Sequence, residues 1–399
     1  MRSPHRVVIA GGGIAGLEAL LALGALGGSR VDLTLLSAEE DFVYRPMAVA
    51  RPFGLGHAAH TPLADAVGEV GATLKIAALQ SVDPDTRTIR TSDGDLEYDE
   101  LVLALGARSE RAFERGTSWD DRAADEVMSG LMRDLEEGYV PSLAIVVPPG
   151  PGWPLPAYEL ALLIRRDAHG MGMDPKVTLV TPELAPLAVF GPLAVEAITA
   201  ELEAAGVALE TGAYAELTAG DLTRVHLRPG DRSFDARRVL SLPRLLGRPI
   251  PGIPHDADGF VDVDEHCRVR GIDGVWAAGD GIAFPVKFGG LATQQADAAA
   301  EDIAHLAGAV AEPQPFRPVL RGRLLTGAAE RWMRFGAAGG EGHGQVATHA
   351  LWWPPGKVSG RYLAPWLAAR DDQALAAELP EHEGVPVQMD LDRSFAASR

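Results

Sequence analysis

The sequence predicts an α/β protein built from two Rossmann-like dinucleotide-binding domains, the first of them discontinuous, and a C-terminal cap domain. A glycine-rich turn directly follows a short apolar run near the N-terminus, and a similar strand–turn–helix–strand layout returns at 143–183. Much later in the chain, a further apolar run ends in an acid, GVWAAGD (274–280). We expect the first domain at 1–110 and 249–315, the second domain at 111–248 and the cap at 316–399.

The composition is that of a folded protein, and it argues against several classes of function. The chain has 399 residues, 47% of them apolar and 23% charged, so two or three domains are expected. Its 36 basic and 55 acidic residues give a formal net charge of −19, which repels nucleic acid and anionic lipid. No apolar run has the length of a membrane span, and the N-terminus passes directly into a strand, so no signal peptide is expected. We therefore expect no nucleic-acid partner, a cytoplasmic protein, and at most peripheral contact with a membrane.

The first unit has the order strand, turn, helix, strand. RVVIA (6–10) has the length and apolar content of a buried parallel strand, GGGIAG follows, and LEALLALGAL predicts a packed helix. VDLTLLS (31–37) predicts the second strand of this βαβ unit. The stretch 72–97 alternates and contains the turn signals Asp83-Pro84 and Asp93-Gly94, so it predicts hairpin strands, and LVLALGA predicts another buried strand.

The second unit repeats this layout. Residues 110–140 are polar, and we expect them to be helical and to connect the domains. A strand at 143–147 leads into the turn PPGPGWPLPAYE, a helix follows through YELALLIRR, and KVTLVTPE (176–183) predicts the next strand. FGGLATQQADAAAEDIAHLAG predicts an alanine-rich helix that opens on glycines. Three tryptophans beside basic residues at 351–370 favour a lid, a dimer interface or a membrane-facing surface, and the stretch that follows (374–399) is acidic.

The turn after the first strand has the spacing of a phosphate-binding loop. Its glycines form GxGxxG between a strand and a helix, and Glu39 follows the last of them by 23 residues. The first glycine permits the tight turn, the second lets the backbone approach a pyrophosphate, and the third allows close helix–strand packing. The helix N-terminus offers free N–H groups to the phosphates. The candidate dinucleotide-binding residues here are Gly11, Gly13, Ile14, Ala15 and Gly16.

Two distant segments indicate which dinucleotide to expect. GVWAAGDGIAFP resembles the second FAD fingerprint of the flavoprotein disulfide-reductase superfamily, with Gly279 and Asp280 at the end of its strand. LVLALGA resembles the middle motif of that superfamily, with Leu105 in place of the usual threonine. The resemblance implies that FAD is the cofactor and that Asp280 binds its ribityl chain. It also assigns three further residues to the FAD site: Val82, Ala104 and Gly106.

Within that superfamily, the chain resembles sulfide:quinone oxidoreductases and type II NADH dehydrogenases. LLSAEEDFVYRP resembles their loop after the ribose-binding strand, which implies Ser37 or Glu39 at the adenosine ribose. FPVKFGGLATQQAD resembles their segment at the pyrimidine end of the flavin, which implies that Lys287 stabilises negative charge on the reduced ring; an ordinary solvated lysine is the alternative. Of Gln294 and Gln295, we expect at least one on the helix surface. The residues that this resemblance assigns to the FAD are Ser37, Glu39, Arg45, Pro46, Lys287, Phe288 and Gly289.

The cysteine content separates the chain from two activities of these families. Sulfide oxidation and disulfide reduction use cysteines that form and break bonds at the flavin, and Cys267 is the only cysteine here. It lies upstream of GVWAAGD, where we expect it to pack or to hydrogen-bond. We therefore expect neither activity. Because the sequence has no HExxH or comparable metal-binding pairing of histidines with acids, and no cysteine cluster, it also predicts no metal site.

The turn at 148–159 departs from a nicotinamide-binding loop. Only Gly150 and Gly152 remain, prolines remove N–H donors that would cradle a pyrophosphate, and Trp153 fills space that a dinucleotide must approach. Glu183 ends the following strand, where a solvent-facing acid is expected rather than a ribose ligand. Ordinary NAD(P)H binding is therefore not expected.

Glu159 is the candidate proton carrier of this turn. It matches the glutamate that opens the corresponding helix in the families named above, which implies a carboxylate near the isoalloxazine ring that takes or gives a proton as flavin N5 changes redox state. The alternative is a first-turn glutamate favoured by the helix dipole. The candidate catalytic residues are thus Glu159 and Lys287.

These features predict an FAD-dependent oxidoreductase that transfers two electrons through flavin N5. The donor is an unidentified small molecule, and quinone is a candidate acceptor. Two alternatives stay open: an NAD(P)H dehydrogenase with an atypical nicotinamide site, and a flavoprotein without turnover that acts as a sensor or binding partner. A homodimer is compatible with the aromatic surface at 351–370.

Overall fold

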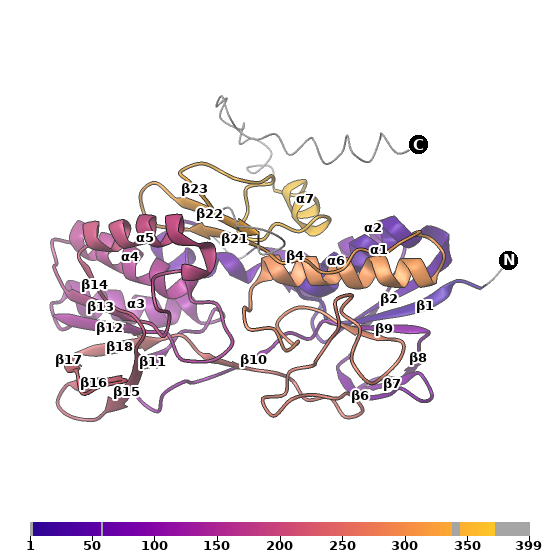
Figure 1. The fold of residues 1–399 in the computed structure, drawn as a ribbon, viewed down its shortest axis with the longest axis horizontal. Coiled ribbons are helices and arrows are strands. Elements are labelled where there is room, and N and C mark those ends of the chain that lie inside the picture. Colours follow the sequence, from indigo (N-terminus) through magenta and orange to yellow (C-terminus); the bar gives the residue numbers. More distant parts are fainter. Residues whose placement is uncertain (1–2, 57–58, 337–343, 372–399) are drawn as a thin grey trace.

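Two lobes, each built on a parallel sheet, make up most of the molecule (Figure 1). The computed structural model describes residues 3–56, 59–336 and 344–371. The first lobe has the strand order β20-β9-β1-β2-β5 and the second has β11-β18-β12-β13-β14, with every neighbouring pair parallel. The predicted α/β class with two Rossmann-like units is therefore confirmed.

The sheet of the first lobe is assembled from two separated parts of the chain. Four strands come from the first part, and the fifth comes from the GVWAAGD segment and pairs with β9. Its strands are β1 (His5–Ala10), β2 (Val31–Ser37), β5 (Thr73–Ile76), β9 (Glu100–Leu103) and β20 (Val275–Ala277). The helices of this lobe that pack near its sheet are α1 (Ile14–Gly27), α2 (Leu63–Val70) and α6 (Gly289–Leu306).

Helices α1 and α6 lie side by side over this sheet (Figure 1). Both carry small residues on their buried faces, which lets the two helix backbones approach closely. Leu17 and Leu20 of α1 share one hydrophobic core with Ala296, Ala299 and Ile303 of α6. Because α1 begins at the glycine turn and α6 begins at Gly289, this packing fixes the two helix N-termini relative to each other.

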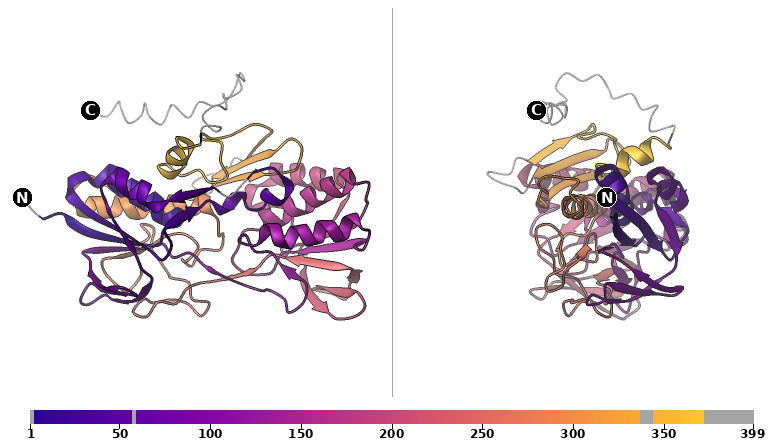
Figure 2. Two further views of the ribbon diagram at one scale, coloured as in Figure 1. Left: turned by 180° about the vertical axis from the view of Figure 1, so that it is seen from behind. Right: turned by 90° about the vertical axis from the view of Figure 1, so that its right-hand side faces the viewer.

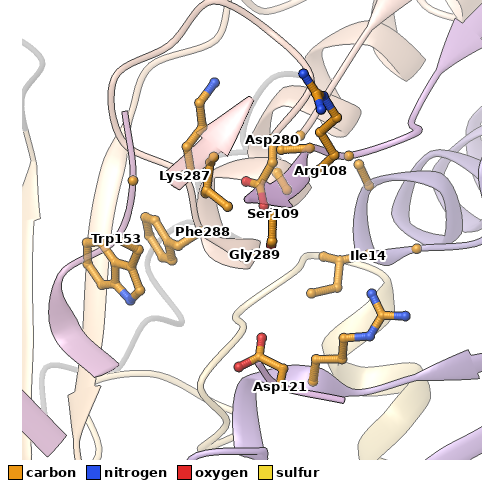
Figure 3. Close-up of a pocket in the computed structure, with 18 of the residues that line it drawn as sticks. Ile14, Arg108, Ser109, Asp121, Trp153, Asp280, Lys287, Phe288 and Gly289 are labelled. Carbon is orange, nitrogen blue, oxygen red and sulfur yellow. The ribbon is translucent and has the colours of Figure 1, made fainter. Parts of the chain in front are cut away.

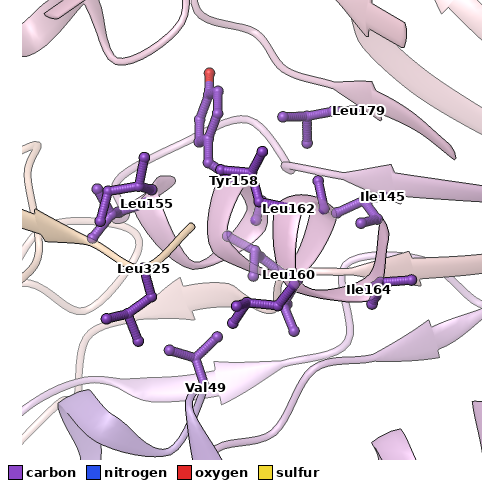
Figure 4. Close-up of a cluster of buried hydrophobic side chains, with 14 of the residues drawn as sticks. Val49, Ile145, Leu155, Tyr158, Leu160, Leu162, Ile164, Leu179 and Leu325 are labelled. Atoms are coloured by element: carbon purple, nitrogen blue, oxygen red, sulfur yellow. The ribbon is translucent and has the colours of Figure 1, made fainter. Parts of the chain in front are cut away.

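The second lobe repeats the layout of the first. Its strands are β11 (Thr117–Ser118), β12 (Ser142–Val146), β13 (Lys176–Val180), β14 (Val207–Glu210) and β18 (Arg238–Ser241). Its helices are α3 (Ala124–Glu136), α4 (Leu155–Gly170) and α5 (Pro192–Ala204). Helix α4 is buried on nearly all sides, because Leu160, Leu162 and Ile164 pack between the sheet and the last third of the chain (Figure 4). The helix that carries Glu159 is therefore the centre of this lobe's core.

Short antiparallel strands are added to each lobe, and one pair of them connects the lobes. The hairpins predicted at 72–97 are present as β6, β7 and β8, although Thr73–Ile76 belongs to the parallel sheet instead. The ribbon of β10 with β19 links the lobes. These strands are β3 (Asp41–Val43), β4 (His60–Pro62), β6 (Leu79–Asp83), β7 (Thr88–Thr91), β8 (Gly94–Glu97), β10 (Arg108–Glu110), β15 (Tyr214–Thr218), β16 (Thr223–Arg228), β17 (Ser233–Ala236) and β19 (Arg244–Leu246).

A third sheet lies along one side of the molecule and reaches toward both lobes (Figure 2). It contains β21 (Val319–Leu324), β22 (Arg331–Gly336) and β23 (Gly344–Ala347), and β21 contacts both α4 and α6. Helix α7 (Leu363–Ala368) then docks on α1, where the buried Glu18 carboxylate accepts the N–H groups of Tyr362 and Leu363 at 2.8 Å each. The acidic stretch 374–399 lies outside the described residues. No helix in the described part of the chain is both long and apolar enough to cross a bilayer.

Candidate functional site

A cavity of about 1210 Å³ lies where the two lobes and the third sheet meet. Its wall begins at the glycine turn, passes the ends of β2 and β9, and continues to the N-terminus of α6, the 148–159 turn and β21. Figure 3 shows the part of the wall between Ile14, Gly289 and Trp153. This volume exceeds the roughly 300–1,000 Å³ of ordinary ligand pockets, so it has room for a large cofactor and a substrate. In the described ranges, no group of three or more histidine, cysteine or acidic side chains is arranged to hold a metal.

The glycine turn leaves backbone donors open to this cavity. Gly11 has φ +123°, and a Cβ there would lie 2.2 Å from the carbonyl oxygen of Ala104. A Cβ on Gly16 would lie 1.7 Å from the Gly11 carbonyl, whereas a Cβ on Gly13 would meet nothing within 4 Å. The turn is thus closed on its protein side and open on its cavity side. Ile14 and Ala15 begin α1 at the same place and also line the cavity.

The end of β2 brings both ribose candidates to the cavity. Ser37 is buried, and its hydroxyl accepts the N–H of Glu39 at 3.2 Å. Glu39 is exposed to the cavity, and neither an ion pair nor a side-chain hydrogen bond of its carboxylate occurs among the described residues. Glu39 therefore has acceptor oxygens available to a ligand, while Ser37 positions the loop that carries it.

Asp280 is an acceptor without a donor. It lies at the cavity wall (Figure 3), and none of the residues that the structure describes donates a hydrogen bond to its carboxylate. Loss of hydration raises the pKa of this carboxyl, and the charge of Lys287 opposes the shift. The preceding Gly279 has φ +87° and donates its N–H to the Oε1 of Gln295 at 2.8 Å. A carboxylate held in this way is suited to accept hydrogen bonds from a bound polyol.

Neither Gln294, which is partly buried, nor Gln295 lies free on the helix surface. Gln295 is buried and holds Gly279, as described above. Gln294 joins α6 to the third sheet, since its amide donates to the Val319 carbonyl at 2.9 Å and its Oε1 accepts the Val319 N–H at 2.9 Å. Both glutamines are structural partners of the backbone that surrounds the cavity.

Most of the other candidate cofactor residues line the same cavity, and Val82 does not. Val82 lies in β6, its side chain is buried in a separate hydrophobic core, and its N–H donates to the Pro251 carbonyl at 2.9 Å. The structure places Ala77, Ala78 and Leu79, just before and at the start of that strand, at the cavity instead. The remaining candidates that line the cavity are Arg45, Pro46, Ala104, Gly106, Phe288 and Gly289.

The 148–159 turn directs its backbone toward the protein. Gly152 donates its N–H to the Pro285 carbonyl and accepts the N–H of Lys287, both at 3.1 Å. The Trp153 ring stacks on Phe288 with centroids 4.4 Å apart and an interplanar angle of 14° (Figure 3). The backbone of Gly152 is here used to clamp the segment that precedes α6.

Glu183 is engaged within the protein, contrary to the expectation of a solvent-facing acid. Its Oε2 accepts the Tyr158 hydroxyl at 2.7 Å and the Thr181 hydroxyl at 3.1 Å. Burial raises the pKa of its carboxyl, and these two donors oppose the shift. Tyr158 itself is fully buried in α4, with its hydroxyl at the edge of the hydrophobic core (Figure 4).

Glu159 lies beyond the first turn of α4, so the helix-dipole alternative is wrong. Its side chain has no exposed surface, and both carboxylate oxygens lie 2.6 Å from Nζ of Lys357, whose side chain is 7% exposed. Oε1 also accepts the N–H of Leu325 at 3.0 Å. Burial raises the pKa of Glu159 and lowers that of Lys357, while each charge opposes the shift of the other. Both residues line the cavity.

The Lys287 ammonium is directed away from the N-terminus of α6. It donates to the Ile282 carbonyl and lies 3.9 Å from the centroid of the Phe260 ring. Figure 3 shows its terminal nitrogen pointing away from Gly289. Burial lowers the pKa of Lys287 to about 8, with Asp280 opposing the shift. The side chain is buried and is not an ordinary solvated lysine, but its charge is used within the protein.

Cys267 packs in the core of the first lobe, as expected. It is fully buried, and burial raises the pKa of its thiol to about 12, so the reactive thiolate is disfavoured at neutral pH. Its φ of +63° is unusual for a residue other than glycine.

The sequence reasoning missed Lys357 as a site residue. It lies in WWPPGKVSG, 198 residues after Glu159, and neither a local motif nor a helical spacing connects the two. The available signal was weak: one lysine in an apolar, tryptophan-rich stretch of an acidic protein.

Comparisons with known proteins agree with this architecture. A family model described as pyridine nucleotide-disulphide oxidoreductase matches residues 5–302. An NADH dehydrogenase-like protein of Mycobacterium tuberculosis is 29% identical over 297 residues, which cover 69% of this chain and 72% of that protein.

Solved structures show the same fold. The sulfide:quinone oxidoreductase from the hyperthermophilic bacterium Aquifex aeolicus has a TM-score of 0.76 and 19% identity, over 86% of this chain and 87% of the other. An NAD-dependent persulfide reductase from A. fulgidus has a TM-score of 0.61 and 18% identity, over 83% of this chain and 64% of the other.

Proposed function

The chain belongs to the pyridine nucleotide-disulphide oxidoreductase family and is an oxidoreductase, and from this premise we propose that it is an FAD-dependent enzyme that reduces a quinone-like acceptor without cysteine chemistry. One observation carries the proposal: a buried ion pair of Glu159 and Lys357 lines the same cavity that opens at the glycine turn. A cofactor cradle and a proton-exchanging pair in one cavity are what an electron-pair and proton transfer requires.

The residues at the first end of the cavity fit FAD. The turn at Gly11–Gly16 leaves open space at Gly13 and unpaired N–H groups at the start of α1, which suits a pyrophosphate. Asp280 has a carboxylate without a donor and would hold ribityl hydroxyls, and Glu39 has free acceptor oxygens for the adenosine ribose. When bound, FAD supplies reversible uptake of two electrons at its ring.

The Glu159–Lys357 pair supplies protons. Burial shifts the pKa of both groups toward their neutral forms, so moving a proton between the ammonium and the carboxylate costs less than it would in water. Lys357 can donate a proton to an acceptor oxygen in the cavity, which leaves a neutral amine beside the Glu159 carboxylate, and a proton from solvent then restores the ion pair. The Leu325 N–H holds the carboxylate in place during this exchange.

The electron donor is proposed to be a small molecule other than NAD(P)H. Gly152 and Glu183, the groups that would meet a nicotinamide dinucleotide, are hydrogen-bonded within the protein, and Trp153 is stacked on Phe288. NADH stays a second candidate, because the mycobacterial relative is named NADH dehydrogenase-like.

Spectroscopy of the purified protein tests this function. We expect a flavin absorption spectrum, no bleaching by NADH, NADPH or sulfide under anaerobic conditions, and reoxidation by a quinone after chemical reduction. Bleaching by NADH or NADPH within the turnover time would replace the proposed donor class with nicotinamide. A colourless protein that takes up no added FAD would overturn the proposal. A protein that keeps FAD but exchanges no electrons with any quinone would favour the sensor alternative.

A further inference from the structure

One positive charge has no ion-pair partner at the end of the cavity that β21 and the Glu159–Lys357 pair border, where we place the acceptor. In this region Glu159 pairs with Lys357, and Arg323 forms a two-point ion pair with Glu330 at 2.8 and 2.7 Å. Each of these pairs is neutral overall. Arg321, two residues before Arg323 on β21, also lines the cavity, and no carboxylate among the residues that the structure describes forms an ion pair with it.

A second arginine lies opposite Arg321. In the antiparallel pairing of β21 with β22, Arg321 is directly opposite Arg334, so both side chains project from the same face of the sheet. Burial and the charge of Arg334 together lower the pKa of Arg321 to about 10. Two like charges at opposed positions destabilise a sheet unless an anion compensates them. Arg334 does not line the cavity, so of these two arginines only Arg321 is within reach of a ligand there.

The strand that carries Arg321 is tied to the segment of Lys357 and leads to Glu159. Arg323 donates to the Pro355 carbonyl at 3.2 Å, which ties β21 to the segment that carries Lys357 and Val358. Leu325, directly after β21, donates its N–H to Glu159 at 3.0 Å. Arg321 therefore lies on the strand that leads to the Glu159–Lys357 pair.

We propose that the substrate that docks between β21 and the Glu159–Lys357 pair is an anion, and that Arg321 binds its carboxylate, sulfonate or phosphate group. This inference rests on the proposed function, because it names the charge of the substrate of that same site. A guanidinium presents several N–H donors in a planar fork that matches such groups. It also attracts an anion into a protein whose net charge of −19 would otherwise repel one. A neutral quinone would leave Arg321 without a partner.

Two probes of the same ring system test the charge. Binding of 1,4-naphthoquinone-2-sulfonate and of uncharged 2-methyl-1,4-naphthoquinone to the oxidised, FAD-containing protein is measured by calorimetry. We expect the sulfonate to bind more tightly, and Arg321→Gln to weaken it about tenfold, the usual effect of losing a charged hydrogen-bond donor. The uncharged probe should change less than about twofold, and Arg321→Lys should recover part of the loss.

Arg334→Gln is the matched control. It removes the opposing charge outside the cavity, so it should leave the preference for the sulfonate intact. Equal weakening of both probes by Arg321→Gln would show that this arginine is only structural. A sulfonate affinity that Arg321→Gln does not alter would also overturn the inference. The flavin content is measured first: a protein without flavin contradicts the proposed function, while a yellow protein that does not discriminate between the probes contradicts only this inference.

Discussion

The two strand–turn–helix units of this chain share an architecture and use their turns in opposite ways. In the first unit, β1 and β2 flank a turn in which none of the described residues accepts the N–H of Gly13. In the second, β12 and β13 flank a turn whose Gly152 is hydrogen-bonded to the segment before α6. The fold requires only that a strand passes into a helix, whereas nucleotide binding requires unpaired N–H groups. A repeated fold therefore does not imply a repeated ligand.

The same contrast holds for the acids that end the second strand of each unit. Glu39 has oxygens free in the cavity, while Glu183 accepts hydroxyl groups of Tyr158 and Thr181. In the second unit, two hydroxyl groups of the protein thus engage one oxygen of the acid, whereas both oxygens of Glu39 are free of such partners among the described residues.

The largest effect is expected from adding one methyl group to the first turn. In Gly16→Ala, the new Cβ would lie 1.7 Å from the Gly11 carbonyl, so the turn must open, and we expect a loss of about 3 kcal/mol or more in stability together with loss of FAD. Gly152→Ala is the matched change in the second turn, where the Cβ meets nothing within 4 Å, and it should cost less than about 0.5 kcal/mol. Flavin-to-protein absorbance ratios and denaturant unfolding measure both. Equal damage at the two turns would contradict the contrast.

The next effect concerns the pair that joins the second unit to the third sheet. Glu159→Gln leaves Lys357 buried without a counter-charge, which should cost about 3 kcal/mol and slow quinone reduction. The double variant Glu159→Gln with Lys357→Met removes both charges, so it should recover most of the stability and none of the rate. Unfolding curves measure the effect on stability, and quinone-reduction rates measure the effect on proton transfer. Recovery of the rate by the double variant would show that the pair has no role in proton transfer.

A smaller effect is expected from the pH dependence of the unfolding free energy, through Lys287 in the segment that Gly152 holds before α6. The pKa of Lys287 is about 8 in the folded protein and 10.5 when unperturbed, so the unfolded chain binds more protons between these values. The unfolding free energy of the wild type should therefore rise relative to that of Lys287→Met as the pH increases from about 8 to about 10, by about 1–3 kcal/mol. Unfolding curves across this range provide the measurement, and parallel profiles for the two proteins would contradict the prediction.

The sequence predicted the parts of this molecule that depend on local order and could not predict those that depend on long-range packing. The GxGxxG turn and the acid Asp280 follow strands directly, so their place at the ends of a parallel sheet could be inferred from the chain alone. Lys357 could not be inferred, because its partner Glu159 is 198 residues away and nothing local connects them. Val82 was assigned to the cofactor by resemblance, but its N–H donates to the Pro251 carbonyl, a contact between parts of the chain that are far apart in sequence.

The smallest effect tests whether the hydrogen bond from Tyr158 to Glu183 is by itself the reason why the second unit does not bind a nicotinamide nucleotide. Tyr158→Phe removes the hydroxyl that Glu183 accepts, which should cost about 1 kcal/mol and leave one carboxylate oxygen less engaged. We still expect no bleaching of the flavin by NADH, because Gly152 stays bonded to Pro285 and Trp153 stays stacked on Phe288. Anaerobic titration of the variant with NADH measures this. If the variant were reduced by NADH, the hydroxyl of Tyr158 rather than the shape of the turn would be what excludes the nicotinamide, and the two turns would differ less than their backbones suggest.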